Sequence, residues 1–308
     1  SDLGVIFISI DDTECSNLIL ICNEIFGASN FVANVSWQRT YSPRNDSKGI
    51  VSEVEHLVVF SKNPGWQPNK LPRTEAMDSR YKNPDNDVAP WKSSDAFAPG
   101  AATHQGMVYA IQHPFTGEML YPSNGRCWRY QQSSMLEYMQ GWCNYRLENL
   151  HDEKERARVC GIDESAVRKD VLAIVLEEPL EVSAAKAQKV YNRGRWPGFY
   201  FTKGGYGGIA RKTYLENVGG RLPTNLWMYE ETGHTDEAKK ELISLFGGRS
   251  PFDTPKPTRL LDFVLKVAGT SETLMLDSFA GSGTTAHAVL NANKADNGNR
   301  HFILIEMM

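Results

Sequence analysis

The chain has 308 residues, of which 41% are hydrophobic and 23% are charged, and its formal net charge is −4 at pH 7. This composition gives ample core for one or two folded domains and excludes a uniformly basic nucleic-acid coat. No apolar run approaches the roughly 20 residues of a membrane span, and five cysteines without C-x-x-C spacing favour reduced thiols and a cytoplasmic location.

The first predicted elements follow from short apolar and amphipathic runs. Residues 5–10 predict a strand, and residues 12–26 predict a helix with Asp11 or Asp12 as its N-cap. We interpret both aspartates as capping or loop residues rather than as catalytic carboxylates. Two further β-rich runs, at 32–37 and 54–61, flank a polar loop at 39–49.

The pattern changes after residue 63. From there to about residue 122 the sequence is rich in Pro, Asn, Asp and Lys and lacks sustained periodicity, which marks an insertion. We expect the insertion to span residues 63–230. Within and after it, helices are predicted at 134–141, 183–191 and 235–246, the last ended by Gly247-Gly248.

A basic and aromatic stretch lies late in the insertion. Between Lys186 and Arg221 there are eight Lys and Arg residues against the single acid Glu216, with aromatic rings and glycines between them. Cations beside stacking rings favour contact with nucleic-acid phosphates, although a glycine-rich loop with a solvated basic face fits the same pattern. The predicted phosphate contacts are Arg193, Arg195, Lys203, Arg211 and Lys212.

The most informative stretch is residues 274–306. Residues 274–276 predict a buried strand, Gly281 and Gly283 permit a tight turn, and Thr284 or Thr285 can cap a helix that continues to about residue 291. A second strand, 301–305, ends at Glu306, where a carboxylate can accept hydrogen bonds from ribose hydroxyls. Since there is no full G-x-G-x-x-G and no Lys after the glycines, we expect a phosphate-free adenosine ligand.

Two motifs carry a family resemblance. Asp277-Ser-Phe-Ala-Gly-Ser-Gly-Thr-Thr resembles the S-adenosylmethionine loop of amino-methylating DNA methyltransferases, and Phe252-Asp-Thr-Pro-Lys-Pro resembles the F-x-x-P-K-P segment that closes over the methionine part of that cofactor. Their order resembles the β class of these enzymes. Segments at 4–12, 18–26, 30–39 and 55–63 are similar to the modification subunit of type III restriction-modification systems.

The resemblance implies an α/β fold. We expect a Rossmann-like sheet of an S-adenosylmethionine-dependent methyltransferase, with helices on both faces, interrupted by a mixed α+β recognition insert. Residues 1–62 and 231–308 would form the catalytic domain, the second part binding cofactor, and 63–230 the insert. The implied cofactor-binding residues are Thr254, Lys256, Pro257, Asp277, Phe279, Ala280, Gly281, Ser282, Gly283, Thr284, Thr285 and Glu306.

Two of these residues have an expected structural role. We interpret Lys256 as holding its own loop rather than acting as a general base, and Asp277 as holding the glycine loop rather than touching the cofactor. The histidines have no metal-ligand spacing, so no metal is expected.

The implied activity is site-specific transfer of a methyl group from S-adenosylmethionine to an exocyclic base amine, with adenine N6 favoured. The expected partners are double-stranded DNA, a second copy of the chain and a restriction subunit, without a membrane. The family's catalytic D-P-P-Y or N-P-P-Y tetrapeptide is nowhere in the sequence. We therefore expect a fragment that lacks the catalytic strand before residue 1 and further strands after residue 308, and we name no catalytic residue.

Two other functions remain open at this point. The chain could be a catalytically incomplete DNA-binding or specificity fragment with a vestigial cofactor site, which the missing tetrapeptide favours. It could also be a nucleotide enzyme unrelated to DNA, and that hypothesis predicts binding of NAD or FAD.

Overall fold

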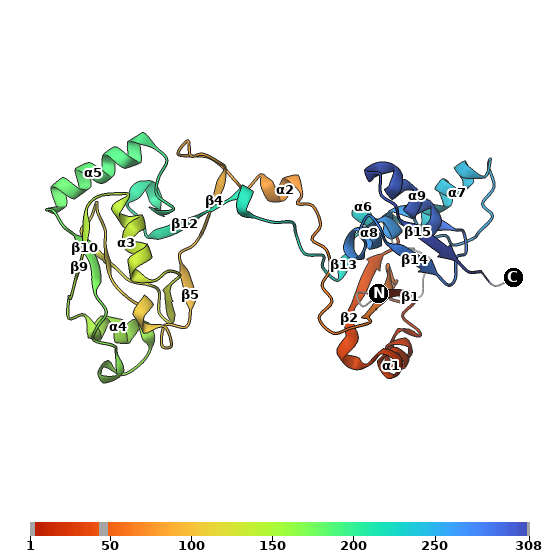
Figure 1. Ribbon diagram of the computed structural model, residues 1–308, viewed down its shortest axis with the longest axis horizontal. Helices are drawn as coiled ribbons and strands as arrows, with labels where there is room; N and C mark the ends of the chain where they lie inside the picture. Colours follow the sequence, from red (N-terminus) through yellow and green to blue (C-terminus); the bar gives the residue numbers. More distant parts are fainter. Residues whose placement is uncertain (1–3, 43–48, 307–308) are drawn as a thin grey trace. The chain divides into compact units, whose positions relative to one another are not determined.

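The computed structural model describes residues 4–42 and 49–306, so residues 43–48 of the predicted polar loop lie outside the described residues. The chain divides into two compact units. Unit 1 combines Ser1–Pro72 with Gly220–Met308, and unit 2 is Arg73–Gly219. Unit 1 therefore contains both the red-orange and the blue segments of Figure 1.

The chain leaves unit 1 and returns to it at adjacent points. Leu71 and Arg221 form an antiparallel bridge and exchange two backbone hydrogen bonds of 2.8 and 2.9 Å. The bridge also requires a small residue, because a Cβ on Gly220 would lie 2.4 Å from the carbonyl oxygen of Leu71. The segments that lead into and out of unit 2 are thus hydrogen-bonded to each other within unit 1.

A four-stranded sheet forms one part of unit 1. Its order is β1-β3-β2-β13, with β3 antiparallel to β1 and β2, and β13 parallel to β2. Strand β3, which lies between β1 and β2, is the most buried of the four strands, and its residues 57–61 are buried. The strands are β1 Val5–Ile10, β2 Phe31–Gln38, β3 Val54–Ser61 and β13 Leu226–Trp227, which confirms the three strands predicted for the N-terminal part.

Helices cover both faces of this sheet. Helix α1, Cys15–Phe26, buries Cys22 against Val58 and Phe60 on one face. Helix α8, Thr258–Ala268, buries Phe263 on the other face, where its ring lies 4.7 Å from that of Trp227. These contacts fix the sheet between two helical layers.

A second, two-stranded sheet forms the rest of unit 1. Strand β14, Leu274–Asp277, is parallel to β15, His301–Leu304, and helix α9, Thr284–Asp296, connects them. Figure 1 shows α8 and α9 beside these strands, and Leu265, Ala288 and Val289 form their shared core. Two further helices, α6 Tyr229–Thr232 and α7 Thr235–Leu245, precede α8.

Unit 2 is a mixed α and β structure with three small sheets. Their orders are β7-β6-β10-β9, β11-β12-β4 and β5-β8, around a core that includes Trp128, Trp142 and Phe199. The strands are β4 Trp91–Asp95, β5 Phe97–Pro99, β6 Ile111–Gln112, β7 Met119–Leu120, β8 Arg126–Trp128, β9 Tyr145–Glu148, β10 Ala173–Leu176, β11 Phe199–Phe201 and β12 Ile209–Tyr214. The helices are α2 Glu75–Asp78, α3 Gln132–Gln140, α4 Glu153–Cys160 and α5 Leu180–Arg193.

Two helix starts differ from the sequence-based prediction. Helix α1 begins at Cys15, after the N-cap Glu14, because Asp12 bonds to His56 and does not cap the helix. Helix α9 has Gly283 as its N-cap and continues to Asp296, so neither predicted threonine caps it. The predicted helices at 134–141, 183–191 and 235–246 are confirmed as α3, α5 and α7.

The helices are short. Among residues 4–42 and 49–306, none combines the length and the apolarity that crossing a bilayer requires.

Candidate functional site

The glycine loop joins β14 to α9 and has an unusual backbone. Gly281 and Gly283 have φ angles of 49° and 74°, in the left-handed region that glycine adopts most easily. A Cβ on Gly281 would lie 3.0 Å from the ring of Phe252, whereas one on Gly283 would meet no described heavy atom within 4 Å. Glycine is therefore favoured at position 281 both by the backbone conformation and by the close contact with the F-x-x-P-K-P segment.

Asp277 holds this loop at its start. One carboxylate oxygen accepts the backbone N–H of Phe279 at 3.1 Å, and the other accepts the hydroxyl of Thr285 at 2.5 Å. The carboxylate thus ties the last residue of β14 to both the loop and the first turn of α9. This geometry is the loop-holding role that the sequence favoured for Asp277.

Glu306 lies directly beside the loop. It follows β15, and its Oε2 accepts the backbone N–H of Gly281 at 2.5 Å. The neighbouring carbonyl of Ile305 accepts the N–H of Ala280 at 3.0 Å, which brings the end of β15 against the loop. A ligand hydroxyl at this position would share the Glu306 carboxylate with Gly281.

Lys256 connects the P-K-P segment to two other elements. Its Nζ forms an ion pair with Glu55 of β3 and lies 5.5 Å from the centre of the Trp37 ring. Its backbone carbonyl accepts the hydroxyl of Thr284 at 3.2 Å, and that hydroxyl also lies 2.8 Å from Ser282 Oγ. The Lys256 side chain therefore contacts the four-stranded sheet, and only its backbone carbonyl bonds to the start of α9.

The predicted cofactor residues occupy a single part of unit 1. Thr254 lies two positions before Lys256, and Pro257, which follows Lys256, is the N-cap of α8. Phe279, in the loop itself, is 76% exposed. The sequence predicted no role for Glu55 or Trp37, because each is about 200 positions from Lys256 in the chain and no local motif predicts a contact over that separation.

A polar network lies at the end of β1, where β3 begins. His56 Nε2 is 2.7 Å from an oxygen of Asp12, and His56 Nδ1 is 3.1 Å from Asn34 Oδ1. The bond from His56, followed by a 2.8 Å bond from the Ser52 hydroxyl, lowers the pKa of the Asp12 carboxyl. Asp12 therefore joins the β1–α1 turn to the segment before β3.

In unit 2, three of the predicted DNA contacts are exposed. Arg193 ends α5, and Arg195 and Lys203 follow it, each with a φ angle of 50° in the left-handed region. Tyr206, 64% exposed, lies beside Lys203. Arg211 is only partly exposed, and within the described part of the chain its Nε is buried without a hydrogen-bond partner.

The prediction for Lys212 is wrong. Its side chain is completely buried and forms ion pairs with Asp85, at 2.5 Å, and Asp87. A buried ammonium held by two carboxylates cannot reach a phosphate. Charge counting along the sequence also overstates the free cations nearby, because Lys186 pairs with Glu178.

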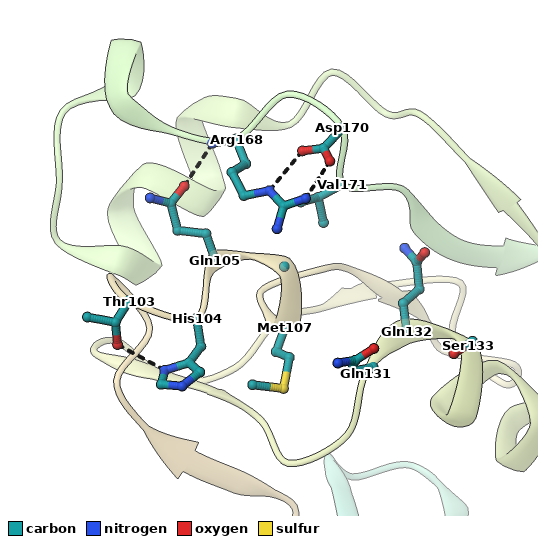
Figure 2. A pocket seen from close by; sticks show the side chains of 11 residues that line it. Thr103, His104, Gln105, Met107, Gln131, Gln132, Ser133, Arg168, Asp170 and Val171 are labelled. Carbon is teal, nitrogen blue, oxygen red and sulfur yellow. Dashed lines mark hydrogen bonds and ion pairs between the residues drawn. The ribbon is translucent and has the colours of Figure 1, made fainter.

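A hollow of about 530 Å³ lies elsewhere in unit 2, between the start of α3 and the segment at 168–171 (Figure 2). Its polar groups largely bond to one another: Gln105 accepts the N–H of Arg168 at 2.7 Å, and the Arg168 guanidinium pairs with Asp170. Its lining contains no predicted cofactor or DNA residue among those described. We assign it no function.

Among the described residues, no three His, Cys, Asp or Glu side chains are grouped as a metal site.

The arrangement in unit 1 defines a class of protein. A strand, a glycine loop and a helix, with an acid at the end of the neighbouring parallel strand, form the geometry with which α/β proteins hold nucleosides. A family model described as DNA methylase matches residues 1–308, and the chain belongs to this family. The resemblance deduced from the two motifs is thereby confirmed.

The chain is similar to known modification enzymes over nearly its whole length. It is 31% identical over 306 residues to the type III restriction-modification enzyme StyLTI Mod subunit of Salmonella typhimurium, covering 98% of this chain and 37% of that protein. It is 26% identical to the type II methyltransferase M.KpnI of Klebsiella pneumoniae, covering 99% and 62%. It is also 26% identical to the EcoPI Mod subunit of Escherichia phage P1, covering 98% and 42%.

These shares show that the chain spans less than two thirds of the length of each of these three relatives.

Proposed function

We propose that the protein to which this chain belongs is a site-specific DNA methyltransferase. It transfers a methyl group from S-adenosylmethionine to an exocyclic base amine, with adenine N6 as the favoured target, and serves as the modification component of a restriction-modification system. The observation that carries the proposal is the glycine loop held by Asp277 and Glu306 within a chain that belongs to the DNA methylase family.

We infer that S-adenosylmethionine binds at the glycine loop. Its adenosine and methionine parts carry no phosphate, which fits a loop without a following Lys. The Glu306 carboxylate can accept ribose hydroxyls, and the exposed ring of Phe279 offers a stacking surface for adenine. When bound, the cofactor supplies an activated methyl group; the loop residues orient it, and Asp277 keeps the loop in place.

We further propose that both sheets of unit 1 belong to one Rossmann-like sheet. Within the sheets of the described residues, β1 and β14 each stand at an edge. Helix α8 contacts both sheets, through Phe263 and through Leu265. The family's catalytic tetrapeptide is absent from this sequence. No catalytic residue is therefore named in this chain.

For unit 2 we propose a target-recognition role, with double-stranded DNA as the ligand. Arg193, Arg195 and Lys203 are exposed, and Arg211 is partly so; we retain these four as phosphate contacts. The names of two relatives, which are Mod subunits of restriction-modification enzymes, support a restriction subunit as a further partner. A second copy of the chain is also proposed as a partner. We also propose a cytoplasmic location, because a modification enzyme acts on the DNA of the cell.

Titration calorimetry with S-adenosylhomocysteine, with NAD as the control ligand, tests the cofactor assignment on this chain. Selective binding of S-adenosylhomocysteine is the expected result. Binding of NAD instead would overturn the proposal, and binding of neither would favour a specificity fragment with a vestigial cofactor site. Incubation of the full-length protein with labelled S-adenosylmethionine and DNA, followed by nucleoside analysis, then identifies the methylated base.

A further inference from the structure

A buried ion cluster in unit 2 has no role in the functions described above. Asp85 and Lys212 both have side chains that are 0% exposed, and their charged atoms lie 2.5 Å apart. Asp87, with a 9% exposed side chain, is the second carboxylate on the same ammonium. Because burying a charge is unfavourable unless it is closely paired, these groups are fixed in position.

The cluster extends directly to the turn that carries Arg195. The same carboxylate oxygen of Asp85 that pairs with Lys212 accepts the backbone N–H of Trp196 at 2.7 Å. The backbone carbonyl of Asp85 accepts the N–H of Arg195 at 2.7 Å. Lys212 Nζ donates to the carbonyl of Trp196 at 2.8 Å. Three backbone groups of the turn, the N–H of Arg195 and the N–H and carbonyl of Trp196, are thus hydrogen-bonded to Asp85 or Lys212.

The backbone of this turn is in a rarely populated conformation. Arg195 has a φ angle of 50° and Gly194 one of 79°. Non-glycine residues remain in the left-handed region only where the surrounding structure determines it. A Cβ on Gly194 would lie 2.3 Å from the Asp85 carbonyl oxygen, so the turn passes Asp85 too closely for any side chain.

Aromatic packing fixes the far side of the same turn. The Trp196 ring is stacked on Tyr191 of α5, with ring centres 4.8 Å apart and planes at 18°. Its indole N–H donates to the carbonyl of Tyr191 at 3.0 Å. The last residues of α5 and the turn therefore form one rigid segment, and this segment presents the exposed side chains of Arg193 and Arg195.

We propose that Asp85, through its ion pair with Lys212, is a positioning residue for DNA binding: it fixes the turn at residues 194–196 so that Arg193 and Arg195 meet the phosphate backbone of duplex DNA. A preorganised cation loses less conformational freedom on binding than one on a mobile loop. The inference rests on the proposed DNA-binding function of unit 2.

The sharpest test moves the turn without changing any charge. Gly194→Ala places a methyl group against the Asp85 carbonyl and leaves Asp85, Lys212 and both arginines in place. Gly161→Ala is the matched control, because Gly161 also has a positive φ, 66°, but an added Cβ there meets no described heavy atom within 4 Å. DNA affinity of the 308-residue chain is measured over a series of salt concentrations, with thermal unfolding of each variant.

We expect Gly194→Ala to lose at least one phosphate contact. Each contact contributes about 0.9 to the slope of log affinity against log salt, which is about tenfold in affinity near 0.1 M salt. The control should keep the affinity and slope of the unchanged chain. A Gly194→Ala variant with unchanged slope would overturn the proposal, since a merely structural role for the cluster leaves the number of ionic contacts as it was.

A second variant, Asp85→Asn, keeps the proposal testable if Gly194→Ala does not fold. Asp85→Asn preserves the shape of the side chain, and Lys212 keeps Asp87 as its partner. The amide has only one acceptor oxygen, so its NH2 group would face either the indole N–H of Trp91, which now donates to the other carboxylate oxygen at 2.8 Å, or the two donors from Trp196 and Lys212. Because one bond to the turn or to Trp91 is lost in either orientation of the amide, we expect a weaker affinity and a lower salt slope than in the unchanged chain, and an unchanged slope would count against positioning.

Arg195→Gln distinguishes a failure of the positioning role of Asp85 from a failure of the proposed DNA surface. If Arg195→Gln lowers the slope by about one unit while Gly194→Ala and Asp85→Asn do not, the DNA surface stands and the positioning role of Asp85 is wrong. If replacing Arg195 and Arg193 changes nothing, the proposed DNA surface itself is wrong, and the role of Asp85 is overturned with it.

Discussion

Replacing Gly281 by valine should abolish cofactor binding while unit 1 stays folded. The backbone at Gly281 has a φ angle of 49°, where an L-residue costs about 1–2 kcal/mol. The added Cβ would also lie 3.0 Å from the ring of Phe252, which is partly exposed and can move aside. We therefore expect a loss of about 1–3 kcal/mol in the free energy of unfolding.

The loss of ligand affinity should be larger than the loss of stability. Valine methyl groups would fill the space beside the loop that the adenosine or methionine part needs, so S-adenosylhomocysteine should bind at least about 100-fold more weakly, which is about 2.7 kcal/mol. Calorimetric titration measures this affinity, and urea denaturation measures the stability.

Gly247→Val is the matched control. Gly247 has a φ angle of 62° in unit 1, but an added Cβ meets no atom of the described residues within 4 Å. It should lose about 1–2 kcal/mol of stability and keep its ligand affinity. Affinity of Gly281→Val within about threefold of the unchanged chain would refute the site assignment, because 1.4 kcal/mol corresponds to tenfold. An equal loss in both variants would attribute the effect to backbone strain alone.

Three other predictions concern charge. Lys256→Met should cost about 1–2 kcal/mol in urea denaturation, because it leaves Glu55 without its ion-pair partner in a partly buried position, and adding Glu55→Gln should restore part of the loss. Burial lowers the pKa of His113, so the folded chain keeps a neutral imidazole while the unfolded chain gains a proton below about pH 6.5. The stability of unit 2 should thus fall as the pH decreases below that value, and His113→Gln should remove this dependence. Arg193→Gln combined with Arg195→Gln should lower the salt slope of DNA binding by about two units at most.

Each of these predictions has an opposing outcome. Full additivity of the Lys256 and Glu55 substitutions would show that the pair does not interact. A pH profile unchanged by His113→Gln would show that another group sets the acid-side stability. An unchanged salt slope in the double arginine variant would locate the DNA surface elsewhere.

Local signals predicted the local structure well. The strand at 5–10 is an apolar run bounded by Gly4 and the aspartates that follow, and both of its ends were predicted correctly. The strand, glycine loop and helix around Gly281 were equally visible, because the glycines and the apolar runs lie within thirty residues of one another.

Contacts between distant residues account for what the sequence did not reveal. The start of α1 was placed too early because Asp12 bonds to His56, 44 positions later, and capping rules consider only neighbours. Lys212 looked like one cation among many in a basic stretch, yet its partner Asp85 is 127 positions earlier. A count of charges records how many cations a segment has, and only the fold decides which of them face water.

The bridge between Leu71 and Arg221 bears on how such proteins diversify. Since the outgoing and returning segments are already hydrogen-bonded to each other within unit 1, the whole of Arg73–Gly219 could be exchanged for an unrelated sequence without breaking a strand pairing of either sheet in that unit. Under the proposed function, replacing the coding segment between these two junctions, which lie together in the fold, would give the methyl-transfer core a new DNA sequence preference in a single recombination event.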